Sequence, residues 1–380
     1  MDVLIPVSNG ASTVESAIGS IQAQTIQDIR IIVVDDGSTD ATAFILDRMA
    51  KADRRIVPVR RVNGGIVDAL NAGLAICTAD LIARHVADDL AVPDRFERQL
   101  DWMQTHPGCS GVSGAVIHID ENGKHLGPKE VPDNPAMANA SLFPQKEPYL
   151  NHPFLMVRRA AVAAVGGYRH VFHAEDTDLY WRLQEQGELA NMPDLLGYYR
   201  VHNQSITSVS TLNGRISAMS SQLSGLSALR RRAGRADIVF PSEALVAYKM
   251  ADSLKDVVAC GAQGLEPDEA VRLAAATSAK MLELSAYRPY ELDSADCVFI
   301  RKSLMREMSS MGRDNRALTI RRISGTAARL MATGHFAEAL RLCPPRLYPQ
   351  FAGRLLLRTA TSPSLRYTLR RLARRPAVVK

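Results

Sequence analysis

Short apolar runs alternate with longer amphipathic segments through the first hundred residues of the chain. The apolar runs are mostly β-branched and occupy residues 3–5, 31–34, 56–59 and 81–83. The segments between them have the length of crossover helices and occupy residues 13–22, 40–50 and 66–76. Such runs are typical of buried parallel strands, and their alternation with helices is typical of α/β sheets. The pattern therefore predicts an α/β fold with a doubly wound, mostly parallel sheet.

The pattern changes further along the chain. Residues 106–212 mix strand-like runs with loops and with one helix from about Asp176 to Gln186. Beyond Asn213 the strand-like runs disappear, and apolar side chains recur at helical spacing. We therefore predict two domains, an α/β domain over residues 1–212 and an all-helical C-terminal domain over residues 213–380.

Polar side chains gather where each of the four predicted strands ends. They are Ser8-Asn9, Asp35-Asp36, Asn63 and Asp88-Asp89. Parallel strands bring their carboxyl ends to one edge of the sheet, and doubly wound folds bind their ligands at that edge. Four polar strand ends in a row therefore predict a binding site there.

Composition narrows the class of protein. The 380 residues are 46% apolar and 23% charged, which excludes wholesale disorder, and the formal net charge of +6 suits an anionic partner. The 5 cysteines are dispersed without a CxxC pair, which argues against a disulfide framework or a structural zinc site. We expect neither a signal peptide nor a membrane-spanning run, and hence a cytoplasmic protein.

The polar strand ends belong to an ordered series of short motifs over residues 2–206. The motifs are IPVSN from Ile5, VVDDGSTD from Val33, NGG from Asn63, ALNAG from Ala69, ADD from Ala87, PDR from Pro93, GGY from Gly166, ED from Glu175 and YRVH from Tyr199. In this order they resemble the family-two inverting glycosyltransferases, which have the GT-A nucleotide-sugar fold. The resemblance implies an enzyme that moves a sugar from a nucleotide-sugar donor onto an acceptor hydroxyl.

The resemblance also implies a nucleotide site, formed by Pro6, Ser8, Asp35, Asp36, Asn63 and Asp88. Asp35 would bind the pyrimidine, because an ionised carboxylate only accepts hydrogen bonds and so suits the N3–H of uracil or thymine. We therefore expect a UDP-sugar donor, with a dTDP-sugar as the second choice. Asn63 is equally consistent with a turn before Gly64-Gly65. Ser8 replaces a Tyr that is frequent in the family, which removes a stacking surface for the base.

A metal motif is implied at Asp88-Asp89, with His202 as a further candidate ligand. Mn²⁺ or Mg²⁺ held by carboxylates would neutralise the charge that accumulates on a diphosphate leaving group. The family usually has another acid two residues before Asp88, where this chain has Val86. It stays open which Asp binds the metal, and the alternative is a solvated loop.

By resemblance, Asp176 is the general base, whereas Glu175, Arg200 and His152 would lie in the acceptor or donor-sugar region. A sugar hydroxyl is a poor nucleophile, so removing its proton during the attack would permit inversion in one step. The alternative is that Asp176 only caps its helix, because acids are favoured at helix N-termini.

The last segment of the chain is basic. Residues 339–380 carry ten cations and no anion, interleaved with apolar side chains. The pattern favours peripheral binding to an anionic membrane on its inner face, and the alternative is an ordinary packed helical face. Because no nucleic-acid module is recognisable, we expect no nucleic-acid partner. The acceptor would be a glycan, a polysaccharide or a lipid-linked sugar.

Two other functions are compatible with the sequence. A sugar nucleotidyltransferase also uses an α/β sheet and acids, but it should carry a cation in the loop after the first strand, and residues 6–10 contain none. A degenerate transferase acting as a binding or scaffold module would explain Val86 and Ser8. The retained acids Asp35, Asp89 and Asp176 favour the enzyme.

Overall fold

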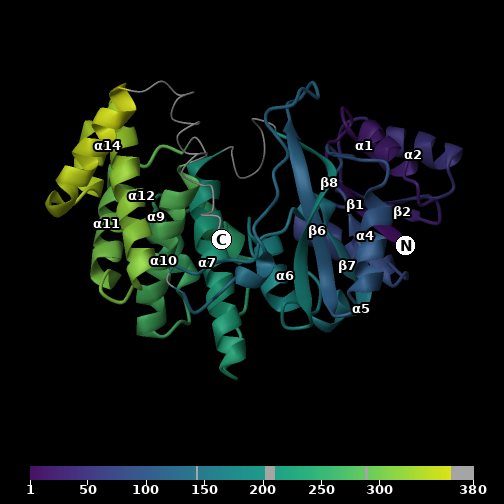
Figure 1. The fold of residues 1–380 in the computed structure, drawn as a ribbon. Helices are drawn as coiled ribbons and strands as arrows, with labels where there is room; N and C mark the ends of the chain where they lie inside the picture. Colours follow the sequence, from purple (N-terminus) through teal and green to yellow (C-terminus); the bar gives the residue numbers. More distant parts are fainter. Residues whose placement is uncertain (143, 202–209, 287–289, 361–380) are drawn as a thin grey trace, which may run out of the picture. The chain divides into compact units, whose positions relative to one another are not determined.

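The computed structural model describes residues 1–142, 144–201, 210–286 and 290–360 (Figure 1). The chain forms two compact units. The sheet unit comprises Met1–Ala140, Lys146–Ser205 and Ser224–Ser242, and the helical unit comprises Ser141–Gln145, Ile206–Leu223 and Glu243–Lys380. The division falls within the long helix α7 (Thr211–Arg232), so that this helix contributes to both units.

The described strands of the sheet unit form one eight-stranded sheet in the order β3-β2-β1-β4-β7-β6-β8-β5. The first four strands along the chain are parallel neighbours, and β6 is parallel to β8. β7 runs antiparallel between β4 and β6, and β5 pairs antiparallel with β8. The bounds are β1 Asp2–Val7, β2 Arg30–Asp36, β3 Ile56–Arg61, β4 Leu81–Arg84, β5 Leu90–Ala91, β6 Cys109–Ile119, β7 Met156–Arg158 and β8 Glu188–Arg200.

Helices cover both faces of this sheet, because successive side chains of a strand point to opposite faces. Val3 and Ile5 of β1 pack into a core with α1 (Val14–Gln22), α2 (Thr42–Ala52) and α4 (Arg95–Thr105). Leu4 packs into a second core on the other face, with α3 (Ile66–Ile76), α5 (Arg159–Ala164) and α6 (Glu175–Leu183). The predicted doubly wound sheet is therefore confirmed.

The regular elements described in the helical unit are all helices, which confirms the prediction of an all-helical C-terminal region. Buried Arg215 of α7 connects the start of α9 with the start of α11. Its Nε donates to Asp296 Oδ2 at 2.9 Å, and its Nη1 donates to the carbonyl oxygen of Asp252 at 2.8 Å. Within the described residues, no helix has the length and apolar character needed to span a bilayer. The bounds are α8 Ala244–Lys249, α9 Leu254–Gly261, α10 Pro267–Leu284, α11 Ser294–Glu307, α12 Arg313–Ala332, α13 Phe336–Leu342, η3 Pro345–Leu347 and α14 Tyr348–Ala360.

Candidate active site

Asp36, the last residue of β2, holds the turn that follows β3. Its buried carboxylate accepts hydrogen bonds from the backbone N–H of Gly64 at 3.1 Å and of Gly65 at 2.8 Å, and it forms an ion pair with Arg61. Its carbonyl oxygen accepts a hydrogen bond from Asn63 Nδ2 at 2.9 Å. Asp36 thus shapes the edge of the sheet where β2 and β3 end.

Asp35 is also buried but makes different contacts. Its Oδ1 accepts a hydrogen bond from the backbone N–H of Ser38 at 3.0 Å. Gly37 turns the chain with a φ of 68°, and a Cβ at this position would lie 2.7 Å from the backbone nitrogen of Asn63. Only glycine fits such a turn without strain, which explains the Gly of the VVDDGSTD motif.

The end of β1 contributes Ser8 to the same edge. Ser8 Oγ donates to the carbonyl oxygen of Asp36 at 3.4 Å and lies 3.5 Å from Asn63 Nδ2. Pro6 is buried within β1, where it pairs with Val34 of β2. The structure therefore brings Ser8, Asp36 and Asn63 together around one carbonyl group, whereas Pro6 lies inside the strand.

Asp88 and Asp89 occupy the turn between β4 and β5, and this turn is tied to the end of β8. Asp89 is 2% exposed, and its Oδ1 accepts a hydrogen bond from Arg200 N at 2.7 Å. Arg200 Nε donates to the carbonyl oxygen of Asp88 at 2.9 Å. Burial, and then the charge of Asp88, raise the pKa of Asp89 well above its usual value. A bound cation would offset both effects, because it favours the ionised carboxylate.

Asp88 and Asp89 are the residues that fit a divalent cation. No group of three or more His, Cys, Asp or Glu side chains gathers as a metal site within the described residues, and His202 lies outside them. Mg²⁺ and Mn²⁺ are commonly held by one or two protein carboxylates together with substrate phosphates and water. Two adjacent carboxylates are therefore sufficient for a site that a diphosphate completes.

Arg84, at the end of β4, is a buried cation that the sequence analysis did not single out. It is 5% exposed, and its guanidinium donates to the carbonyl oxygen of His85. Burial lowers the pKa of Arg84, and the neighbouring tyrosines Tyr168 and Tyr180 and carboxyl groups of Glu175 and Asp89 oppose this change. Arg84 thus interacts electrostatically with the Asp88-Asp89 turn and with the start of α6. The sequence does contain a signal for this role of Arg84, namely a basic residue at the end of an apolar strand. A buried arginine needs acidic partners nearby.

Two half-buried acids open α6. Asp176 Oδ1 accepts a hydrogen bond from the backbone N–H of Thr177 at 2.7 Å, so this carboxylate contacts the first turn of its helix. Burial and then the charge of Asp176 raise the pKa of Glu175 to about 7, and Arg84 opposes the rise. Burial also raises the pKa of Asp176. Carboxylates with raised pKa values are suited to accepting a proton near neutral pH.

His152 of the short helix η2 (His152–Phe154) lies near the tyrosines on this side of the sheet. Its Nε2 is 2.8 Å from the Tyr168 hydroxyl, with which it shares a hydrogen bond, and burial keeps its pKa well below the usual value. Asn71 of α3 fixes the backbone of Tyr168 through two hydrogen bonds of 2.9 Å. This contact explains why the ALNAG and GGY motifs occur together.

Asp178, one turn into α6, has a structural role. It is fully buried and accepts hydrogen bonds from Arg182 Nη2 at 2.7 Å and Arg169 Nε at 3.0 Å. In Asp178→Ala the two arginines lose their shared anion, so the free energy of unfolding should fall by about 3–5 kcal/mol in urea denaturation. Asp101→Ala, on an exposed part of α4, should change it by less than about 0.5 kcal/mol. Equal effects of the two substitutions would contradict this role.

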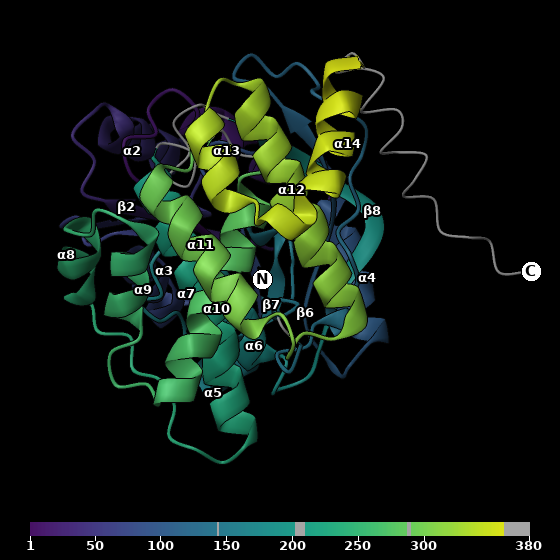
Figure 2. The ribbon, with the colours of Figure 1, turned by 90° about the vertical axis from the view of Figure 1, so that its left-hand side faces the viewer.

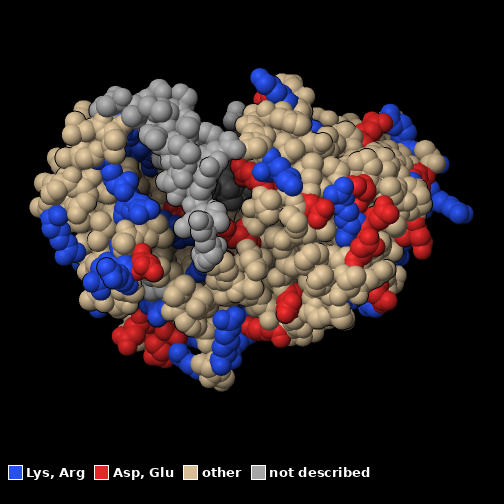
Figure 3. Space-filling model, in the orientation of Figure 1, with Lys and Arg blue, Asp and Glu red and all other residues tan. Residues whose placement is uncertain are grey.

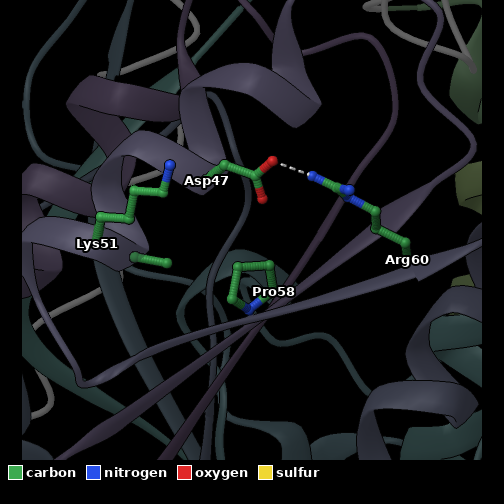
Figure 4. A pocket seen from close by; sticks show the side chains of 5 residues that line it. Asp47, Lys51, Pro58 and Arg60 are labelled. Carbon is green, nitrogen blue, oxygen red and sulfur yellow. Dashed lines mark hydrogen bonds and ion pairs between the residues drawn. The ribbon is translucent and has the colours of Figure 1, made fainter.

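A hollow on the surface of the sheet unit is separate from these acids. It has a volume of about 570 Å³, and Figure 4 shows Asp47 and Arg60 across it, joined by a 2.5 Å ion pair between half-exposed side chains. The other lining residues are Ala50, Lys51 and Pro58, from α2 and the edge strand β3. None of the predicted site residues lines this hollow.

An α/β sheet with acids at its strand ends is the arrangement expected of a glycosyltransferase of the GT-A type. Residues 2–166 match the family model described as "Glycosyl transferase family 2". The amylovoran biosynthesis glycosyltransferase AmsE of Erwinia amylovora is 33% identical over 186 residues, which cover 48% of this chain and 68% of that protein. The chain belongs to glycosyl transferase family 2, which decides for a transferase over a nucleotidyltransferase or a non-catalytic scaffold.

Other relatives have related names. The putative glycosyltransferase EpsE of Bacillus subtilis is 31% identical over 195 residues, covering 49% of this chain and 67% of that protein. The O-antigen biosynthesis glycosyltransferase WbnJ of Escherichia coli is 27% identical over 209 residues, covering 54% and 81%. Among solved structures, S. aureus TarS 1–349 in complex with UDP has a TM-score of 0.47 at 15% identity, covering 82% of this chain and 92% of that one.

Proposed function

We propose that the sheet unit transfers a sugar from a UDP-sugar to an acceptor hydroxyl, with inversion at the anomeric carbon and with the help of Mn²⁺ or Mg²⁺. The observation that supports this most is the position of Arg84. Its charge acts on Asp89 in the metal-binding turn and on Glu175 at the start of α6. The candidate metal ligands and the candidate base therefore share one neighbourhood of the sheet unit.

Asp176 acts in this proposal as the general base, and its charge raises the pKa of the neighbouring Glu175. As Asp176 takes the proton of the acceptor hydroxyl, the hydroxyl oxygen forms a bond to the anomeric carbon. The bond between that carbon and the diphosphate oxygen breaks on the opposite side, and UDP leaves with the electron pair. The metal, held by Asp88 and Asp89, would stabilise the negative charge of the diphosphate. Arg200 keeps the turn that carries both acids in place.

Asp35 selects the donor in this proposal. Its carboxylate accepts hydrogen bonds only, and it lies at the carboxyl end of β2, where α/β sheets bind ligands. Uracil and thymine present an N3–H donor to such a group, so we propose UDP-sugars first and dTDP-sugars second. Ser8, Asn63 and Asp36 form the remainder of this edge.

The names of two relatives support a proposal for the class of acceptor. Two of them carry names that refer to the biosynthesis of amylovoran and of O-antigen. We propose that this chain likewise extends a glycan, a polysaccharide or a lipid-linked sugar, and that Glu175, Arg200 and His152 border the acceptor or the donor sugar.

Release of the free nucleotide from a panel of donors tests the proposal. UDP should be released slowly from one UDP-sugar in the presence of Mn²⁺ without any acceptor, and an acceptor should speed this release. Asp35→Ala should weaken the binding of UDP, because it removes the acceptor for the base. Release from a GDP-sugar but from no UDP- or dTDP-sugar would overturn the donor proposal.

The pH dependence of transfer is a further expected result. A general base must be ionised to accept a proton, and burial raises the pKa of Asp176 above its usual value. We therefore expect kcat/KM to rise with pH through an apparent pKa above the usual value of an aspartate. The charge of Asp176 contributes to the raised pKa of Glu175, so Asp176 ionises first and Glu175→Gln should leave this rise in place. A rise that moves in Glu175→Gln would contradict the assignment of Asp176 as the base.

The raised pKa of Glu175 also makes the free energy of unfolding depend on pH. The folded-state pKa of Glu175, about 7, lies above its usual 4.5, so the folded protein binds this proton more tightly than the unfolded chain does. The free energy of unfolding should therefore decline as pH rises from 4.5 towards 7. Glu175→Gln should lack this part of the decline in urea denaturation.

We also propose peripheral binding to an anionic membrane through residues 339–380. In the structure, α13, η3 and α14 are helical up to residue 360, and Leu342, Leu347 and Phe351 are buried. Packing thus accounts for part of the apolar pattern, whereas Leu356 is 68% exposed. Residues 361–380 lie outside the described residues, and their sequence adds six of the ten cations.

Vesicle sedimentation tests the membrane proposal. The full chain should co-sediment with vesicles of anionic lipid, dissociate as salt rises, and ignore neutral vesicles, because each cation near an anionic surface contributes about 1 kcal/mol. A chain ending at residue 360 keeps the packed helices and should lose most of this binding. Equal binding of both chains would contradict the role of the last twenty residues.

A further inference from the structure

The helical unit contains a groove between α9, α10 and α11, which contact one another (Figure 2). It has a volume of about 880 Å³. Small side chains from the three helices contribute to its apolar lining, which we call the floor: Ala259, Ala262, Ala270, Ala274 and Ala295. Val258, Val271, Val298 and Phe299 complete the apolar lining, and Val298 is 43% exposed. The groove is therefore apolar and open to solvent.

Four cations border this apolar floor. Lys255, Lys302, Arg306 and Arg341 line the groove, and no carboxylate does. Lys255, Lys302 and Arg306 form no ion pair with any residue of the described part of the chain. Two acids near the rim accept hydrogen bonds from its serines, since Ser253 Oγ donates to Asp256 Oδ2 and Ser294 Oγ donates to Glu338 Oε1, both at 2.6 Å. Glu338 also interacts electrostatically with Arg341. Figure 3 shows both basic and acidic side chains over the visible surface of this unit.

The dimensions and charges of the groove decide between occupants. Small-molecule sites enclose about 300–1,000 Å³ and are mostly apolar with a few polar groups, whereas a stable protein interface covers about 800 Å² on each partner. A cavity of about 880 Å³ falls in the small-molecule range. The basic segment 361–380 of this chain carries six cations and no acid, so the cations of the rim would repel it. An apolar chain with an anionic head matches both the floor and the rim.

We propose that this groove binds the apolar chain of an anionic lipid, a lipid phosphate, with the phosphate held by Lys302, Arg306 and their two neighbouring cations. Burial of a hydrocarbon chain contributes about 0.8 kcal/mol for each methylene removed from water. The phosphate makes charge-assisted hydrogen bonds to Lys and Arg, which are stronger than bonds between neutral groups. The site belongs to the helical unit alone and does not depend on the transferase proposal.

Titration calorimetry with decyl phosphate tests the proposal, using the full-length protein and concentrations below micelle formation. Decyl phosphate should bind the wild-type protein, whereas decyl glucoside and inorganic phosphate should bind at least about tenfold more weakly. Decyl glucoside lacks the charged phosphate, and inorganic phosphate lacks the apolar chain. Lys302→Glu with Arg306→Glu should raise Kd by at least about tenfold through charge reversal. Ala259→Trp should have a comparable effect by filling the floor.

Two matched controls lie on exposed positions of the same unit outside the groove. Arg313→Glu reverses a charge on α12, and Ala337→Trp adds the same bulk on α13, and neither should change Kd. Thermal unfolding of each variant shows whether it is folded. Equal affinity of decyl phosphate for the wild type and the groove variants would overturn the proposal, since binding would then reside elsewhere, for example on segment 361–380. Binding of inorganic phosphate as tight as that of decyl phosphate would also overturn the proposal. So would an acidic amphipathic peptide that binds through the groove when decyl phosphate does not.

Discussion

Asp176→Asn should reduce sugar transfer by a factor of about 10² to 10⁴, the usual loss when a general base is removed. The asparagine keeps an oxygen that can accept the Thr177 N–H, so the first turn of α6 should be preserved. Burial raises the pKa of Asp176, and a neutral side chain removes the cost of burying a charge, so thermal stability should be unchanged or higher. Steady-state transfer, UDP binding and thermal unfolding together measure these effects.

Two further variants show whether the loss of transfer is specific to Asp176. Asp101→Asn, on the exposed side of α4, should leave transfer unchanged. Glu175→Gln should keep the base and most of the transfer activity. If Asp176→Asn transfers sugar at the wild-type rate, Asp176 only caps the helix. If Glu175→Gln shows the large loss instead, the base is Glu175.

Chelation of divalent metal should abolish transfer, and Mn²⁺ or Mg²⁺ should restore it. Asp89→Asn should lose at least the tenfold to hundredfold in metal affinity that outer-shell substitutions typically cost, since here a direct ligand would be changed. Because Asp89 is nearly fully buried and accepts the Arg200 N–H, asparagine is the suitable replacement. Asp89→Ala would leave that N–H without its acceptor and should also lower the free energy of unfolding by about 1–3 kcal/mol.

Direct measurement of Mn²⁺ binding, in the presence of UDP, separates a metal effect from a folding effect. Asp89→Asn should remain folded and lose Mn²⁺ binding, while Asp101→Asn should bind Mn²⁺ normally. Transfer that continues at the full rate in excess chelator would exclude the metal-dependent mechanism.

The parallel half of the sheet was predictable because its strands are short, apolar and β-branched, and because turn residues separate them from the helices. The antiparallel half was harder to predict. β5 has only two residues, Leu90 and Ala91, and its pairing with β8 depends on contacts across more than a hundred residues of sequence. The end of the α/β part was also obscured, since one continuous helix, α7, belongs to both units.

Within the candidate site, the sequence identified side chains with recognisable motifs, and it missed those that depend on tertiary burial. Arg84 appears in the sequence as the last residue of an apolar strand, and only the fold shows that Tyr168 and Glu175, far along the chain, lie near it. The two acids of the VVDDGSTD motif look equivalent in sequence. In the structure Asp36 binds Arg61 and two backbone N–H groups, whereas Asp35 contacts only its own turn among the hydrogen bonds described.

This difference between Asp35 and Asp36 has a consequence for evolution. A substitution at Asp36 would release the turn after β3 and would be removed by selection for a folded protein. A change at Asp35 to a side chain of similar size, such as Asn, would affect only one local hydrogen bond among those described. If Asp35 selects the base as proposed, descendants of this gene could acquire a preference for another nucleotide through such a change, while Asp36 stayed fixed and kept the scaffold intact.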